Sequence, residues 1–292
     1  MEKTRTTALI LLLFKAIPLP LRRIFFVGLC RLFYLVVPRQ RMITLHNLQR
    51  AYPEKSLEEI TAIAKGAYRH LGFMAADFFE IPWIDRGNLH RWVECEGLEH
   101  YEAAISQGKG ILSIVAHFGN WELMTAVIPL VAQPMNIVYR PLDNPVLENL
   151  FAWVRSCHGN DLLPKEGAGM KILRLLRRNQ TLGILIDQNA AVREGIFVDF
   201  FGRPACTASG LAILAMRSGA PVIPAFLPRQ ADGRYKLILL PPVSLDHTGD
   251  FEQDLVTNTQ RFTRVIEDMV RQYPDQWFWL HQRWKTKTCQ RQ

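Results

Sequence analysis

The sequence has no long apolar run, few cysteines and none of the short motifs that mark common hydrolases. No uninterrupted apolar stretch reaches the ~18–20 residues that a membrane-spanning helix needs. The five cysteines of the 292-residue chain are widely spaced and include no C-x-x-C pair, which argues against a zinc site or a disulfide framework. G-x-S-x-G and H-E-x-x-H are both missing, so a serine hydrolase or a zinc protease is disfavoured.

Positive charge is concentrated at the two ends of the chain. Lys and Arg number 35 and Asp and Glu number 27. Residues 1–50 hold nine basic side chains and one acid, and residues 281–292 add four basic side chains and no acid, which leaves 22 bases and 26 acids in between. A nucleic-acid-binding protein spreads its cations over one face, so we expect no nucleic-acid partner. Basic ends favour docking onto an anionic surface.

Short apolar stretches alternate with basic residues over residues 8–37. Lys15 interrupts the first stretch, two prolines follow, and the pair Arg22-Arg23 precedes the next apolar stretch. This pattern is typical of two short helices that lie in a membrane interface, with Lys and Arg side chains reaching toward lipid phosphates. A true span over residues 15–37 and a helical pair buried against the body remain alternatives.

Strand and helix patterns alternate through the rest of the chain. The apolar runs 111–115 and 182–186 are typical of strands buried on both faces. The alternation predicts an α/β fold with a mainly parallel sheet flanked by helices. No linker interrupts it, so we expect a membrane-anchoring helical segment over residues 1–50 and one α/β domain over residues 51–292. Predicted helices cover 56–80, 98–107, 120–131, 144–157, 170–178, 209–217 and 251–272, and the other predicted strands cover 92–95, 136–139, 221–226 and 235–240.

The best candidate for chemistry lies where the strand 111–115 ends, because active sites of such sheets lie beyond the carboxyl ends of their strands. His117 and Glu122 are five residues apart, which on one continuous helix would place their side chains about 140° apart. We therefore expect a helix that begins near Asn120, its N-cap, so that His117 lies in the preceding turn and meets Glu122. A carboxylate bonded to one imidazole nitrogen raises the basicity of the other, as a general base requires.

The segment Ala116–Glu122 resembles the His-x4-Asp/Glu motif of the glycerolipid acyltransferase superfamily. Its form HFGNWE is similar to the branch of bacterial lipid A biosynthesis (late) acyltransferases. Further blocks in the same order make the resemblance specific and extend it to Lys285. These blocks are Val138–Pro141 with Asp143–Pro145, Leu185–Gln188 with Phe197–Gly202, Ala220–Pro224, and a C-terminal group of Pro274, Gln276, Trp277, Trp279, His281 and Arg283–Lys285.

The resemblance implies transfer of a fatty acyl chain from acyl carrier protein to a hydroxyl of a lipid A precursor at the cytoplasmic face of the inner membrane. No metal and no cofactor are expected. His117 would be the general base, and Glu122 would orient it and stabilise its charge. The substrate-binding residues so implied, which would contact the oxyanion, the phosphates or the rim of the site, are Asn120, Arg140, Arg155, Asp187 and Gln188. Phe197–Phe201 would either line the acyl groove or pack in the core.

Three other functions stay open from the sequence. The same chemistry would act on another membrane lipid, such as an ornithine lipid, a glycolipid or a lysophospholipid, because the motif recognises a hydroxyl and a thioester. A membrane-bound hydrolase would need an activated nucleophile or a metal, for which the sequence shows no motif. A membrane-docked scaffold without catalysis would tolerate changes at His117 and Glu122.

Overall fold

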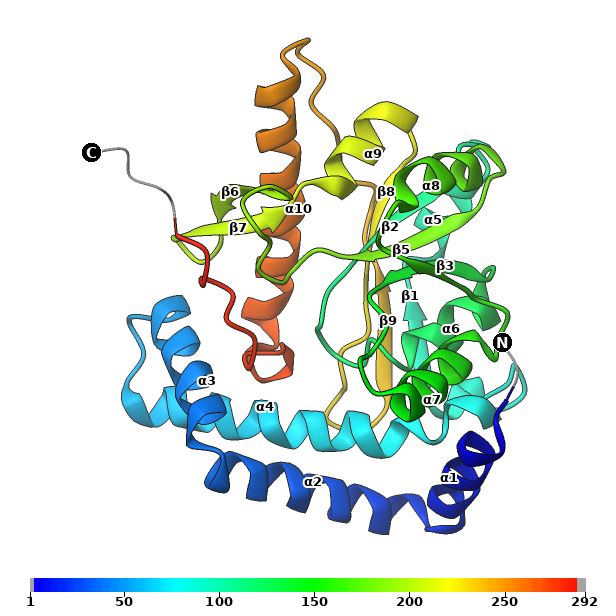
Figure 1. Ribbon diagram of the computed structural model, residues 1–292, viewed down its shortest axis with the longest axis vertical. Coiled ribbons are helices and arrows are strands. Elements are labelled where there is room, and N and C mark those ends of the chain that lie inside the picture. The colour runs from blue at the N-terminus through cyan, green and yellow to red at the C-terminus, as the bar shows by residue number, and fades with distance from the viewer. Residues whose placement is uncertain (1–2, 288–292) are drawn as a thin grey trace.

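Seven strands form the central sheet of the computed structural model, which describes residues 3–287 (Figure 1). Their order is β1-β9-β8-β2-β5-β3-β4. Neighbours pair in parallel except for β8 and β9, which are antiparallel. The predicted class, an α/β fold with a mainly parallel sheet, is therefore confirmed. The strands are β1 (Val93–Glu96), β2 (Ile111–Val115), β3 (Met135–Tyr139), β4 (Asp161–Pro164), β5 (Thr181–Leu185), β8 (Val222–Phe226) and β9 (Tyr235–Leu239).

Helices cover both faces of this sheet because alternate side chains of each strand point to opposite sides. On the central strand β2, Leu112 and Ile114 belong to one buried cluster and Ile111 and Val115 to the other. The first cluster includes residues of α8, α9 and α10, and the second includes residues of α5, α6 and α7. These helices are α5 (Leu98–Ile105), α6 (Met124–Val131), α7 (Pro145–Ser156), α8 (Ala168–Arg177), α9 (Gly210–Ser218) and α10 (Phe251–Gln272).

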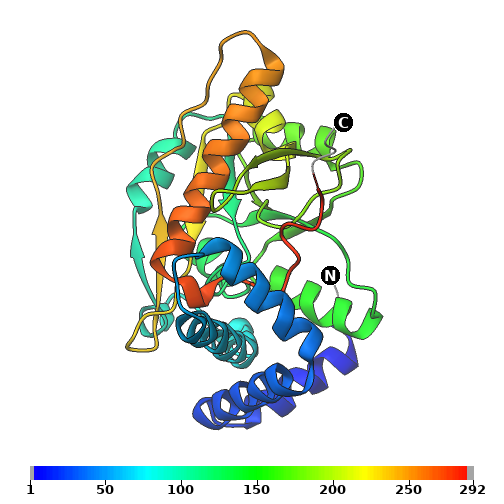
Figure 2. The same ribbon diagram turned by 90° about the vertical axis from the view of Figure 1, so that its left-hand side faces the viewer.

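Four helices at the N-terminus form the base of the molecule (Figures 1 and 2). They are α1 (Arg5–Ala16), α2 (Leu19–Val36), α3 (Pro38–Ala51) and α4 (Leu57–Phe78). The predicted capping box that opens α4 is present, since Ser56 and Glu59 bond each other's backbone N–H groups. Helix α2 packs along α4 so closely that a Cβ on Gly72 would lie 2.6 Å from the backbone of Val27.

Three of the basic side chains that we expected to reach lipid phosphates instead pair with carboxylates of α4 and the turn after it. Arg23 donates to both oxygens of the fully buried Asp77, at 2.8 and 3.0 Å. Lys15 bonds Glu80 at 2.6 Å, and Arg22 bonds the same carboxylate. The expectation was wrong for these three because a charge removed from water needs a partner of opposite sign. No helix within the described residues is both long and apolar enough to span a bilayer.

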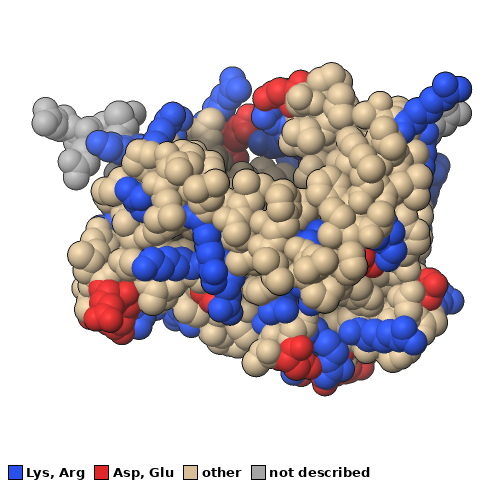
Figure 3. Space-filling view, turned by 90° about the horizontal axis from the view of Figure 1, so that it is seen from below, with Lys and Arg blue, Asp and Glu red and all other residues tan. Residues whose placement is uncertain are grey.

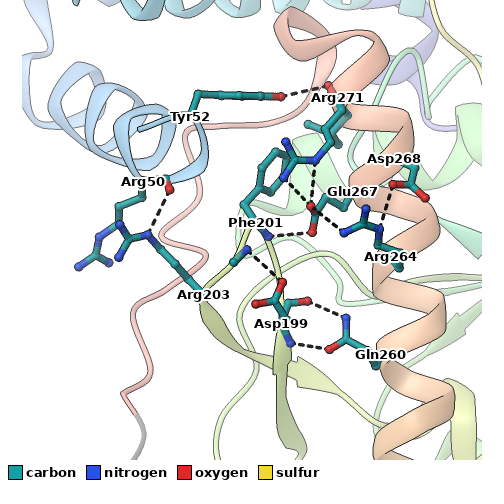
Figure 4. A network of polar contacts seen from close by, with 12 residues as sticks. Arg50, Tyr52, Asp199, Phe201, Arg203, Gln260, Arg264, Glu267, Asp268 and Arg271 are labelled. Carbon is teal, nitrogen blue, oxygen red and sulfur yellow. Dashed lines mark hydrogen bonds and ion pairs between the residues drawn. The ribbon is translucent and has the colours of Figure 1, made fainter. Parts of the chain in front are cut away.

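A separate antiparallel hairpin, β6 (Gly195–Asp199) and β7 (Pro204–Ala208), lies beside α10. Figure 4 shows the polar contacts that join them. The buried carboxylate of Glu267 on α10 accepts from the backbone N–H of Phe201 at 2.7 Å and from the guanidinium of Arg271 at 2.7 Å. The backbone of Asp199 exchanges two hydrogen bonds with the Gln260 amide. Helix α10 therefore fixes the hairpin against the sheet.

Candidate active site

The ring of His117 is held by Asp187, and the register of the sheet explains why. Strands β2 and β5 are parallel neighbours in which Val115 lies opposite Leu185. His117 and Asp187 each follow their strand by two residues, so both reach the carboxyl edge side by side. Asp187 accepts hydrogen bonds from the ring Nδ1 and from the backbone N–H of His117, both at 2.9 Å. The prediction that Asp187 shares the rim with His117 is confirmed.

Asp187 is buried, with only 3% of its surface exposed, and it is fully supplied with donors. The indole Nε1 of Trp277 donates to its second oxygen at 2.8 Å. Burial favours the neutral acid, but the His117 charge and the hydrogen bonds from His117 and Trp277 outweigh it, so the pKa of Asp187 lies below its ordinary value. An ionised Asp187 places the ring proton on Nδ1 and leaves Nε2 as the basic nitrogen.

Glu122 pairs with Arg155 of α7 and not with His117. The guanidinium donates from Nε and from one Nη to the two carboxylate oxygens, at 2.9 and 2.6 Å, and Trp121 Nε1 donates at 3.2 Å. Within residues 3–287 no hydrogen bond joins Glu122 to His117, so the expected direct contact is wrong. The planar fork of Arg155 satisfies both oxygens at once, which a single ring nitrogen does not do. Glu122 is linked to the histidine through Trp121, whose ring centroid is 5.3 Å from that of His117.

The turn between β2 and α6 is fixed from several sides. The Oδ1 of Asn120 accepts from the N–H of Leu123, and the backbone carbonyl of Asn120 accepts from Met124, so Asn120 starts the first turn while the regular helix begins at Met124. His70 of α4 donates from Nε2 to the carbonyl of Gly119 at 2.9 Å. Gly119 has φ +58°, and a Cβ there would meet the Leu227 carbonyl at 2.3 Å, so only glycine fits.

A cavity of about 1050 Å³ opens beside His117. Glu122, Arg140, Arg155 and Gln188 line it together with His117, whereas Asn120 is fully buried and does not line it. Asp187 is buried as well and does not line the cavity. The prediction that Asn120 and Asp187 bind substrate is therefore wrong: Asn120 holds the turn, and Asp187 holds the ring of His117. The Gln188 amide nitrogen is 3.4 Å from His117 Nε2. Apolar side chains of the wall include Val115, Ile137, Leu173, Ile184, Leu211 and Leu214.

Arg140 lies at the rim of this cavity and Arg155 inside it. The Arg140 side chain is 77% exposed and pairs with Asp143 at 2.7 Å, whereas the Arg155 side chain is 17% exposed. The sequence predicted a place near the site for both, and both line the cavity. Since Glu122 neutralises Arg155, Arg140 is the arginine with more freedom to meet an anion.

The segment after β5 is anchored by the C-terminal part of the chain, a contribution that sequence reasoning missed. The N–H of Asn189 donates to Nε2 of His281 at 2.9 Å. Burial lowers the pKa of His281, which keeps this nitrogen free to accept. Arg283 is fully buried and donates to the Cys206 carbonyl at 2.8 Å. Burial lowers the pKa of Arg283 to about 10. The C-terminal sequence block was the only signal for these residues, and it did not indicate their contacts.

Two further expectations are corrected or refined by this arrangement. Phe200 and Phe201 do not line the cavity, because both are buried and pack against tryptophans of the core, Phe200 edge-on against Trp277 and Phe201 at a tilt against Trp279. The predicted basic C-terminal end includes Arg291, which lies outside the described residues.

A family model described as bacterial lipid A biosynthesis acyltransferase matches residues 5–286. The chain belongs to this family. The protein is therefore an acyltransferase, and the resemblance drawn from the sequence blocks is confirmed.

Several similar proteins are named as acyltransferases of lipid A biosynthesis or of phosphatidylinositol mannoside. The chain is 31% identical to the lipid A biosynthesis lauroyltransferase of Escherichia coli over 89% of this chain and 84% of the relative. It is 27% identical to the lipid A biosynthesis palmitoleoyltransferase of the same organism, over 85% and 80%. It is 25% identical to the phosphatidylinositol mannoside acyltransferase of Mycolicibacterium smegmatis, over 70% and 67%.

Replacing Asp187 by Asn tests whether this carboxylate sets the proton on His117. We expect kcat for acyl transfer to fall about 10³–10⁴-fold with little change in KM, because an amide does not hold the required tautomer or stabilise an imidazolium. Asp232→Asn, at an exposed carboxylate paired with Arg234, is the control and should leave kcat unchanged. A loss below about tenfold in a folded Asp187→Asn protein would contradict the role.

Proposed function

We propose that this protein transfers a fatty acyl chain from acyl carrier protein to a hydroxyl of a lipid A precursor, at the cytoplasmic face of the inner membrane. The observation that carries the proposal is the His117–Asp187 pair, which leaves Nε2 of His117, beside the Gln188 amide, as the basic nitrogen at a largely apolar cavity. The names of the lipid A relatives support the acceptor. The donor and the location come from the family resemblance.

In the proposed reaction, His117 Nε2 removes the proton of the acceptor hydroxyl while the hydroxyl oxygen attacks the thioester carbonyl carbon. A tetrahedral oxyanion forms, and the imidazolium is stabilised by the Asp187 carboxylate. The intermediate then collapses, the carbon–sulfur bond breaks, and His117 returns the proton to the leaving thiolate. An ester and a free thiol result. The chain needs no covalent intermediate and no metal for these steps.

The neighbouring residues support positioning in this mechanism. Glu122 assists His117 indirectly, because its pairing with Arg155 fixes Trp121 against the imidazole ring. The Gln188 amide lies next to Nε2 and has N–H donors for the developing oxyanion or the acceptor oxygen. Arg140, at the rim, suits the phosphates that a glycolipid acceptor and a phosphopantetheine arm both carry.

The apolar wall of the cavity suits an acyl chain. Burial of each methylene contributes about 0.8 kcal/mol of binding free energy, so apolar contact alone holds a fatty chain without specific polar contacts. The volume of about 1050 Å³ lies just above the range of typical ligand sites, which runs from about 300 to 1,000 Å³.

A second acceptor class has a specific observation in its favour. The mycobacterial relatives are named as phosphatidylinositol mannoside acyltransferases. Their names specify a glycolipid acceptor other than lipid A. The His117–Asp187 geometry serves any lipid hydroxyl equally well. The alternative is therefore the same chemistry on another membrane lipid.

The apolar face of α1 and α2 is the surface we assign to the membrane. Many of its large apolar side chains are between 57% and 70% exposed, among them Leu12, Ile24 and Leu35. Arg31 and Arg39 are exposed beside them and form no ion pair within the described residues. Figure 3, seen from the side of these helices, shows a mostly uncharged face with Lys and Arg distributed among the uncharged residues. A large apolar face with basic side chains suits an anionic bilayer surface.

Mass spectrometry of lipids tests the reaction and the acceptor together. Purified protein, acyl carrier protein loaded with a fatty acid and a lipid A precursor should give a product heavier by one acyl group. His117→Ala should abolish it, because no other group removes the hydroxyl proton, and His46→Ala, at an exposed histidine, should not. Activity retained by His117→Ala would refute the mechanism. Transfer only to a phosphatidylinositol mannoside acceptor would select the alternative.

Vesicle sedimentation tests the membrane face. Leu21→Ser, Ile24→Ser and Leu35→Ser combined should weaken binding to phosphatidylglycerol vesicles at least about tenfold, because apolar area no longer leaves water. Leu57→Ser, Phe251→Ser and Val256→Ser change exposed apolar side chains on α4 and α10 and should bind like the wild type. Unchanged binding of the first variant would remove α1 and α2 from the membrane contact.

A further inference from the structure

Helix α8 carries an unusually basic surface. Residues 165–178 contain five basic side chains, at Lys165, Lys171, Arg174, Arg177 and Arg178, and one acid, Glu166. Lys165 pairs with Glu194. The other four cations are exposed and form no ion pair within residues 3–287.

The amphipathic pattern of α8 explains why these charges face outward. Ala168, Ile172 and Leu176 are buried against the body, so the charged positions on the opposite side of the helix point to solvent. Helix α9 packs against α8 and adds the exposed Arg217 near its end. We call the set Lys171, Arg174, Arg177, Arg178 and Arg217 the α8–α9 basic surface.

This surface is joined to the active-site cavity. Residues 168–170, Ile172 and Leu173 of α8 line the cavity, and so does Arg217 of α9. His117 lines the same cavity. A partner that docks on the α8–α9 basic surface therefore lies next to an opening that leads to the catalytic base.

The position of the surface selects the kind of partner. Helices α8 and α9 lie at the end of the molecule opposite to α1 and α2, in both ribbon views (Figures 1 and 2). If α1 and α2 contact the bilayer, the α8–α9 basic surface points away from it. The five cations of this surface repel one another, and an acidic partner that covers them relieves the repulsion. Because the surface points away from the bilayer, an acidic protein suits it better than a lipid surface.

We propose that the α8–α9 basic surface docks an acidic acyl carrier protein, so that the thioester on its flexible arm enters the cavity beside α8 and reaches His117. The inference rests on the proposed function, which names the donor but not where it binds. It gives the two substrates separate entrances: the acceptor lipid arrives from the membrane side and the donor from the opposite side.

Paired substitutions on α8 test the docking surface. We would measure the Kd for the carrier protein in the absence of any acceptor, KM and kcat with the loaded carrier protein, and the rate with an acyl-pantetheine thioester that lacks the protein. For Arg174→Glu/Arg177→Glu we expect Kd and KM to rise at least about tenfold, more at low salt than at high salt, with kcat and the acyl-pantetheine rate unchanged. The milder Arg174→Gln/Arg177→Gln should show the same effect at about threefold, which guards against misfolding of the first variant.

The matched control is Arg86→Glu/Arg91→Glu, which reverses two exposed cations that precede β1 at the far edge of the sheet and form no ion pair within residues 3–287. It should bind the carrier protein like the wild type. A Kd within twofold of the wild type for both α8 variants would overturn the proposal. Lost binding to phosphatidylglycerol vesicles with unchanged carrier binding would also overturn it and assign the surface to lipid. Weakened carrier binding by the α8 variants, in a protein that acylates no lipid tested, would keep the docking surface and refute the proposed function.

Discussion

The hydrogen bond between His117 and Asp187 is the interaction on which the rest of the site depends. It exists because β2 and β5 are parallel neighbours in register, so that the residues two positions past each strand meet at the same edge. Everything around it restricts movement: Trp277 donates to the carboxylate, and His70 donates to the turn that carries the histidine. A base with one fixed tautomer and an unprotonated Nε2 is the consequence.

The two residues that form the sequence motif do not pair with each other in the folded site. In the sequence, His117 and Glu122 form the recognisable pair. In the fold, the carboxylate next to the imidazole comes from a strand some seventy residues later, and Glu122 forms a bidentate ion pair with Arg155. The motif therefore specifies a turn with two functions: its histidine faces the substrate, and its glutamate fixes α7 and Trp121 to that turn. With only the Asp187 bond, or only the contact of Trp121 that Glu122 fixes, the imidazole would be less constrained.

Much of the fold was predictable because hydrophobic periodicity and helix caps are encoded by residues that lie close together in the sequence. The apolar run 111–115 coincides with β2, and the predicted helix 251–272 coincides with α10. The strand β4 was missed because only Leu163 of its four residues is buried. The hairpin β6–β7 was missed because β6 buries only Val198 and β7 consists of small residues, so neither shows the fully buried apolar run of β2. Site residues were recovered where they follow buried strands. The partners of Asp187 and Glu122 were not predicted. A contact between distant segments depends on strand order and helix packing, which hydrophobic periodicity does not encode. The division of the chain at residue 50 stays a prediction.

The geometry assigns the proton on Nδ1 of His117 to a hydrogen bond with Asp187 and not with Glu122. Proton and nitrogen NMR of the histidine ring tests it most directly, in the wild type and in two isosteric variants. We expect a slowly exchanging, downfield Nδ1–H resonance of His117 that persists in Glu122→Gln and is lost in Asp187→Asn. A resonance that survives in Asp187→Asn and disappears in Glu122→Gln would contradict it.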